Sequence, residues 1–209
     1  MLPVHDLPLF AAAALLVNLT PGPDMLFVVG SSAAHGRRAG VMAALGIGAG
    51  CLLHMALATL GLSALLAASA TAFELVKWLG AAYLVWIGVG MLRQRRGAAL
   101  SPASVPPRRV FWQGALTNAL NPKVALFFLA FLPQFITPQA SGQALAFLAL
   151  GGLFNLGGTA VNIAVALLAG ALRDRLAGAA SQGWLGAWLK RVAGALFVAL
   201  GLKLAFSSR

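Results

Sequence analysis

The chain has 209 residues, of which 60% are hydrophobic, 15 are basic and only 4 are acidic. Charged residues make up 9% of the chain, whereas about a quarter is usual in soluble domains. This composition excludes an ordinary soluble enzyme, a disordered chain and a nucleic-acid-binding domain with a solvated basic face. It predicts a small polytopic membrane protein whose partner is the lipid bilayer and not nucleic acid.

Six stretches are long and apolar enough to span a membrane as helices, which takes about 20 residues each. The expected helices cover residues 7–29, a stretch within 40–67, 72–92, 110–136, 143–172 and 187–206. These stretches are too long and too uniformly apolar for the alternating strands of a membrane barrel. The fold class is therefore predicted to be all-α, with residues 1–209 forming one transmembrane domain.

The first expected helix carries a motif that should break it near mid-membrane. Proline inside a helix removes a backbone donor, and the freed carbonyls must find other partners. Asp24 is the only acid well inside a predicted span, and such a carboxylate usually marks a polar pathway or a proton site. The alternative is a plain kink with Asp24 reaching the cytoplasmic face. The candidate site residues here are Asn18, Thr20, Pro21, Gly22, Pro23 and Asp24.

The second and third expected helices offer weaker candidates. His54 lies in a charge-free span and is expected to be a hydrogen-bonded core residue, with a proton relay as the alternative. Gly46 and Gly50 are spaced to let another helix approach closely. In the third helix, the hydroxyl of Tyr83 could line a path, and packing is an equally good interpretation.

The fourth expected helix repeats the pattern of a proline flanked by amides. Lys123 is the only basic residue far from an interface, and at that depth it costs several kcal/mol unless it is paired or hydrated. Asp24 is the predicted partner, either in a working site or in a purely structural ion pair. The candidate residues in this segment are Asn118, Asn121, Pro122 and Lys123.

The fifth expected helix adds Asn155, with Asn162 seven residues later on the same face. Both amides could hydrogen-bond across the bundle. The single cysteine and three histidines form no cluster with metal-ligand spacing, so we expect no metal and no cofactor. The sequence also lacks the serine, zinc and paired-cysteine motifs of hydrolases and oxidoreductases, which argues against an intramembrane enzyme.

The basic residues predict an orientation. Eleven of the 15 lysines and arginines lie in the loops after the odd-numbered helices, and three lie on the opposite side. Because basic loops stay in the cytoplasm, we expect both termini to face outside. A linker at 93–109 divides the chain into halves of three helices, about 1–95 and 108–209. Three is an odd number, so the halves enter the membrane in opposite directions.

Weak internal similarity agrees with an inverted repeat. A shift of 101 residues places Pro21 on Pro122 and His54 on Asn155. Interrupted helices at matching positions of inverted halves indicate the binding site of a transporter. Helix N-termini there suit a carboxylate, while C-terminal carbonyls suit an ammonium. A zwitterionic amino acid presents both groups.

Four segments together resemble the lysine exporter superfamily, and within it the homoserine/threonine exporter branch of bacterial amino-acid exporters. They are Asn18–Asp24, Lys77–Leu84, Asn118–Lys123 and Phe127–Phe135. The resemblance implies a six-helix carrier in the bacterial inner membrane that exports amino acids in exchange for protons. Threonine or homoserine, leucine and lysine are all compatible substrates, and a homo-oligomer is possible. An exporter of another solute or ion and a passive channel remain the alternatives.

Overall fold

The computed structural model describes residues 2–60, 105–137 and 140–177, together with scattered helical positions elsewhere. Within these residues the named elements are all helical, which confirms the all-α class for this part of the chain. The predicted third and sixth helices, Tyr83 and most of the linker at 93–109 lie outside the described residues. The arrangement of six helices in two inverted repeats is therefore not tested.

The first expected span is two helices, α1 (Leu7–Leu19) and α2 (Pro23–His35), which meet at an angle of 48°. The break falls at the predicted motif. Pro23 occupies the first turn of α2, where its missing N–H leaves no helical hydrogen bond unmade. The second helix continues six residues past the predicted end at 29, to His35.

The other described elements follow the predicted spans. They are α3 (Arg37–Thr59), α6 (Pro107–Ala119), α7 (Pro122–Leu126), a π-helical turn η1 (Phe127–Phe131), a 3₁₀ turn η2 (Leu132–Phe135) and α8 (Gln143–Ala177). The fourth span is again broken at the predicted proline, with a bend of 47° between its two parts. Among the described residues, α3 and α8 are long and apolar enough to cross a membrane, and each bent pair can supply one further span.

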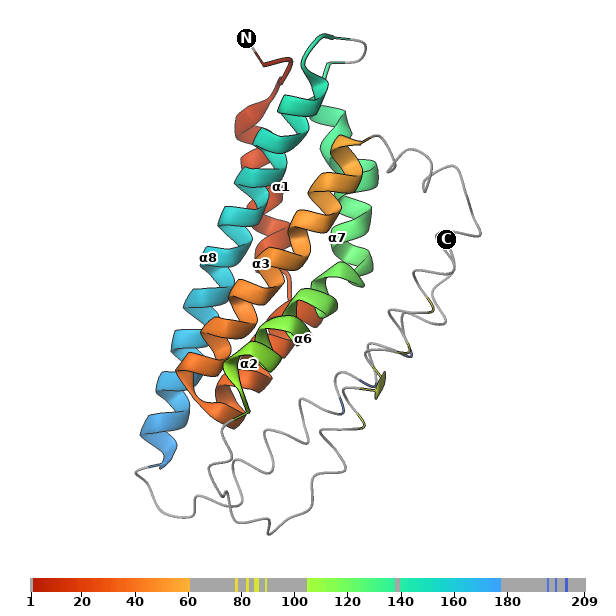
Figure 1. Cartoon of the computed structure of the whole chain (residues 1–209). Helices are drawn as coiled ribbons and strands as arrows, with labels where there is room; N and C mark the ends of the chain where they lie inside the picture. Colours follow the sequence, from red (N-terminus) through yellow and green to blue (C-terminus); the bar gives the residue numbers. More distant parts are fainter. Residues whose placement is uncertain are drawn as a thin grey trace.

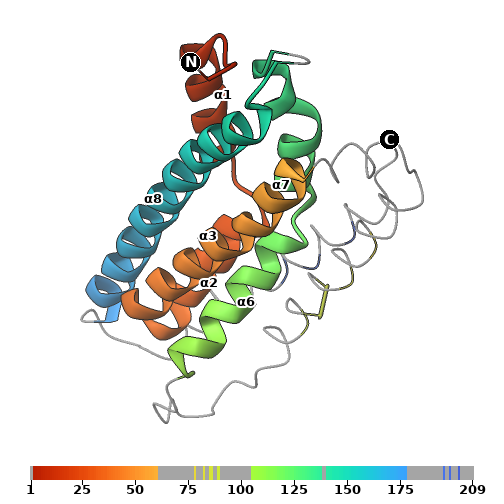
Figure 2. The same cartoon turned by 45° about the horizontal axis from the view of Figure 1, so that its top comes forward.

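The broken spans run in opposite directions (Figure 1). The pair α1–α2 descends from the end that carries the N-terminus, whereas α6–α7 ascends towards it, as α3 does. Helix α8 then descends beside α3 along nearly the whole length of the molecule, and α3 lies between α8 and α6 (Figure 2).

Close packing of α3 against α6 depends on glycines. A Cβ atom on Gly46 would collide with the carbonyl of Phe111, and one on Gly50 would collide with the carbonyl of Ala115. Without side chains at these positions the two backbones come into direct contact, which is the expected use of small residues between membrane helices. The predicted packing role of Gly46 and Gly50 is confirmed.

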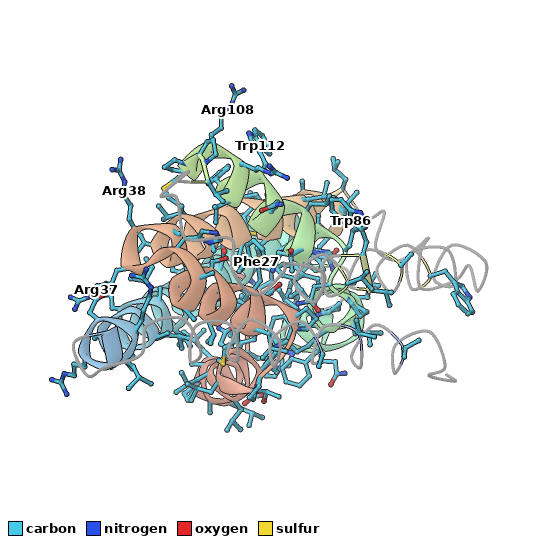
Figure 3. The ribbon with its side chains drawn as sticks, turned by 90° about the horizontal axis from the view of Figure 1, so that it is seen from below. Phe27, Arg37, Arg38, Trp86, Arg108 and Trp112 are labelled. Atoms are coloured by element: carbon cyan, nitrogen blue, oxygen red, sulfur yellow. The ribbon has the colours of Figure 1, made fainter. Side chains whose placement is uncertain are left out.

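The basic residues of the described loops gather at one end of the bundle. Figure 3 looks at this end and shows Arg37, Arg38 and Arg108 projecting outward, while the buried Phe27 lies among the helices. Arg37 at the start of α3 forms an ion pair of 3.0 Å with Asp174 near the end of α8. At the opposite end an isolated antiparallel bridge joins Val4 to the residue after η2.

Candidate functional site

The break between α1 and α2 meets the break between α6 and α7, and Lys123 joins them. Its ammonium Nζ donates hydrogen bonds to the carbonyl of Val17 at 3.1 Å and to that of Thr20 at 2.9 Å. These carbonyls belong to the last turn of α1, where the helix offers them no backbone partner. A cation at a helix C-terminus is also favoured by the macrodipole. Lys123 therefore caps the broken end of α1.

Asp24 lies in the first turn of α2 and is only 7% exposed. Its Oδ2 accepts a hydrogen bond of 2.8 Å from Nδ2 of Asn118, which lies at the end of α6. The helix N-terminus favours this negative charge. This burial contradicts the alternative in which Asp24 reaches the cytoplasmic face.

The expected ion pair between Asp24 and Lys123 does not form. Among the described residues, each of the two side chains is instead met by a helix end and by neutral partners. Within residues 2–60, 105–137 and 140–177, the other oxygen of Asp24, Oδ1, is buried and makes no hydrogen bond that meets the geometric limits, and the same holds for Oδ1 of Asn118 and Nδ2 of Asn121. Buried polar atoms rarely remain unpaired, so this cluster has unused capacity to bind a polar ligand.

The remaining residues of the two motifs shape the break. Oδ1 of Asn121 accepts from the backbone N–H of Lys123 at 3.0 Å and so caps α7, which begins at Pro122. A Cβ atom on Gly22 would lie 3.3 Å from the ammonium of Lys123, so glycine leaves room for that side chain. The hydroxyl of Thr20 donates back to α1 and is not directed to the other break.

A small cavity lies beside these charges, with free space of about 30 Å³. Five of the predicted site residues line it: Asn18, Asp24, Asn118, Lys123 and Asn155. This space holds about two water molecules and is too small for an amino acid. A ligand of that size therefore requires the side chains or helices around the cavity to move apart.

Helix α8 forms one wall of the cavity. Nδ2 of Asn155 donates to the carbonyl of Gly48 on α3 at 3.2 Å, and Asn18 of α1 donates to the carbonyl of Phe154 at 3.1 Å. Both amides tie α8 to the first half of the chain, as the sequence predicted for Asn155. His54 of α3 does not line the cavity, and its Nε2 donates to the carbonyl of Asn118 on α6 at 3.0 Å. This matches its predicted role as a hydrogen-bonded core residue.

Sequence reasoning missed several lining residues. Thr159 lies four residues after Asn155 and lines the same cavity. This spacing places both residues on one face of a helix and could have identified Thr159 from the sequence. Cys51 and the apolar part of the wall carried no signal, because apolar residues are common throughout these helices. The apolar lining residues are Met25, Ile47, Cys51, Val124 and Phe154.

The site thus combines one buried acid, one lysine, several amides and an apolar wall around one cavity. A family model described as LysE type translocator matches residues 15–208. The chain belongs to the LysE-type translocator family. Proteins of this family are membrane transporters and not enzymes.

Relatives of this LysE-type protein extend the comparison. An uncharacterized membrane protein of Pseudomonas aeruginosa is 34% identical, over 97% of this chain and 95% of its own length. A leucine efflux protein of an Enterobacter species is 33% identical, over 70% of this chain and 71% of its own. A homoserine/homoserine lactone efflux protein of Salmonella typhimurium is 35% identical, over 68% of this chain and 69% of its own length. No solved structure is significantly similar to the chain.

Proposed function

We propose that this protein exports amino acids from the cytoplasm across the bacterial inner membrane, as a secondary carrier that exchanges them for protons. Family membership supports transport, and the names of two relatives support amino acids as the class of substrate. The observation that carries the proposal is the cavity where Asp24 and Lys123 lie close together without pairing. An amino-acid zwitterion supplies both missing partners.

Each of the two charged side chains binds one end of the zwitterion. The carboxylate of the substrate approaches the ammonium of Lys123, which is held at the end of α1 by two carbonyls. The ammonium of the substrate approaches Oδ1 of Asp24, for which the described part of the chain supplies no hydrogen-bond partner. Asn118 fixes the other oxygen of that carboxylate. Charge-assisted hydrogen bonds at both ends are stronger than bonds between neutral groups.

Asp24 also provides a simple route to proton exchange. The carboxylate binds either the substrate's ammonium or a proton, because protonation removes the charge that attracts the ammonium. A proton arriving from outside therefore releases the amino acid there. Loss of that proton to the cytoplasm restores the carboxylate for the next amino acid, so one proton enters the cell for each substrate that leaves.

The movement that exposes the site alternately to each side is a rocking of two inverted halves. The broken spans α1–α2 and α6–α7 run in opposite directions, as an inverted repeat requires. The expected helices at 72–92 and 187–206 complete the two halves. The basic end of the bundle faces the cytoplasm in this proposal, so the N-terminus faces outside.

Transport by purified protein in vesicles tests the function. Labelled leucine, homoserine, threonine and lysine are offered with and without an imposed pH gradient, and uptake against a concentration gradient is measured. We expect gradient-driven uptake of at least one amino acid, and its abolition by Asp24→Asn, because an amide keeps the shape of the side chain but carries no exchangeable charge.

The matched control is Asp6→Asn, which removes an exposed acid outside the cavity and should leave uptake within about twofold. Gradient-driven uptake by the Asp24→Asn protein would remove this residue from proton coupling. Failure to transport any amino acid would overturn the proposed function: transport of another solute by the same vesicles would indicate a different exporter, and single-channel current in bilayers would indicate a passive channel.

A further inference from the structure

The face of α8 that lines the cavity carries polar side chains. The proposed binding of a substrate's amino and carboxyl groups does not use them. Asn155, Thr159 and Asn162 lie at intervals of four and three residues, so they share one face of the helix, and all three line the cavity. Asn155 is engaged with α3, and the hydroxyl of Thr159 donates to Oδ1 of Asn155 at 3.4 Å. The face therefore continues the polar site along α8.

Asn162 differs from its two neighbours because it has no hydrogen-bond partner among the described residues. Its side chain is only 8% exposed, and it borders the same cavity as Asp24 and Lys123. Its unused donor and acceptor therefore indicate a place for a ligand group that both donates and accepts.

The position of Asn162 suits the side chain of a short amino acid. The C-terminal end of α1 lies level with Gly158, because a Cβ atom on Gly158 would contact the side chain of Asn18. Asn162 lies one helical turn further along α8, which is about 6 Å. A two-carbon arm ending in a hydroxyl, together with a hydrogen bond of about 2.8 Å, spans a comparable distance. The apolar side chains of the lining, such as Ile47 and Phe154, accommodate the methylene groups.

We propose that Asn162, supported by Thr159, is a specificity-determining residue that reads a hydroxyl group on the substrate's side chain. This inference rests on the proposed function of the cavity. The hydroxyl donates to Oδ1 of Asn162 and accepts from its Nδ2. An aliphatic side chain of the same length leaves both atoms unpaired, and sites built to hydrogen-bond a substrate hydroxyl discriminate strongly against analogues that lack it.

Homoserine and norvaline test this inference directly, because they differ only by a terminal hydroxyl in place of a methyl group. Initial exchange rates of both labelled amino acids are measured with the full-length protein in vesicles. We expect the unmodified protein to prefer homoserine at least tenfold. Asn162→Leu should remove or reverse the preference while exchange of norvaline or leucine persists, and Asn162→Ala serves if the larger residue prevents folding.

The matched control is Ser32→Ala, which removes another buried and unpartnered polar group, on α2 and outside the cavity. Its preference for homoserine should be unchanged. Equal rates for homoserine and norvaline in the unmodified protein, or an unchanged preference in both Asn162 variants, would overturn the inference and leave amino-acid export intact. Failure of the unmodified protein to exchange any amino acid would overturn the inference together with the proposed function.

Discussion

At the scale of single residues, the site shows how a membrane protein holds two opposite charges apart. A buried charge needs compensation, and direct pairing of Asp24 with Lys123 would provide it. The chain uses the broken helices instead: the end of α1 meets the ammonium and the start of α2 meets the carboxylate. Each charge is stabilised in place and stays available to a third group, which a direct ion pair would prevent.

We predict that Lys123→Gln lowers both stability and substrate binding. The substitution weakens the hydrogen bonds to Val17 and Thr20 and removes the charge that the substrate's carboxylate would meet. A carbonyl that loses its partner away from water costs about 1–3 kcal/mol, and the two carbonyls here are only partly buried or exposed within the protein. Thermal unfolding in detergent should shift to lower temperature, and amino acids should no longer raise the unfolding temperature. Arg38→Gln, an exposed cation at the basic end, should change neither quantity.

The sequence predicted the breaks and most of the charged and amide residues around them. Proline and glycine in a span allow few other outcomes, and a buried acid or lysine is conspicuous in so apolar a chain. A direct ion pair of Lys123 with Asp24 does not form, and the backbone carbonyls that Lys123 meets instead cannot be identified from a sequence. Coupling of the two residues through the substrate stays a prediction. The cavity wall was only partly predicted, since α8 is apolar on nearly every side and its pattern does not indicate which face is buried.

At the scale of elements, the contact between α3 and α6 is set by glycines that admit no side chain. We predict that Gly46→Ala destabilises the folded protein, because the added methyl group would collide with the carbonyl of Phe111 and force the helices apart. Gly152→Ala on α8 is the matched control, since a Cβ there meets nothing within 4 Å. Alanine should stabilise that helix by up to about 1 kcal/mol.

Thermal unfolding of the two alanine variants in the same detergent measures this difference. The Gly46 variant should unfold several degrees lower than the unmodified protein, and the Gly152 variant at the same temperature or higher. Equal unfolding temperatures for the two variants would show that α3 and α6 do not pack as closely as described.

The ion pair between Arg37 and Asp174 joins α3 to α8 at the basic end. Because it is half exposed, it contributes only about 0–1 kcal/mol to stability, but it bridges the two halves that are expected to move. We predict that cross-linking Arg37→Cys to Asp174→Cys, in a Cys51→Ser background, stops transport. Reduction of the cross-link should restore transport. Undiminished transport by fully cross-linked protein would contradict rocking of the halves at this end.

Helix boundaries show where element prediction failed. The first span ends at His35 and the fifth at Ala177, beyond the predicted 29 and 172, because arginines and polar residues at the ends remain helical outside the apolar core. The π and 3₁₀ turns after α7 were not predicted either. Their apolar residues are indistinguishable from a regular helix by hydropathy, although Pro133 in η2 explains why the span ends there.

At the scale of the whole molecule, the clustering of Arg37, Arg108 and Arg173 at one end argues for an orientation in the membrane. Basic ends remain in the cytoplasm, so the loop that contains Ser141, at the other end, should face outside. We predict that Ser141→Cys is labelled in intact cells by a thiol reagent that cannot cross the membrane, and that Arg108→Cys is not. Both are made in a Cys51→Ser background, and the opposite labelling pattern would reverse the orientation.

The thiol of Cys51 can report on whether the cavity is occupied. Cys51 is the single cysteine of the chain, lines the cavity with Asp24 and Lys123, and is 2% exposed. A thiol reagent can reach it only when the cavity opens, and a bound amino acid should shield it. The unmodified protein therefore reports on occupation of the site without any substitution.

The central claim is that this cavity binds the zwitterionic part of an amino acid. The rate of Cys51 alkylation by a small maleimide tests it most directly, measured on purified protein with a transported amino acid, with its methyl ester, and with neither. We predict that the free amino acid slows alkylation at least fivefold and that the ester, which lacks the carboxylate for Lys123, leaves the rate unchanged. Equal alkylation rates with the free amino acid and without it would contradict the account.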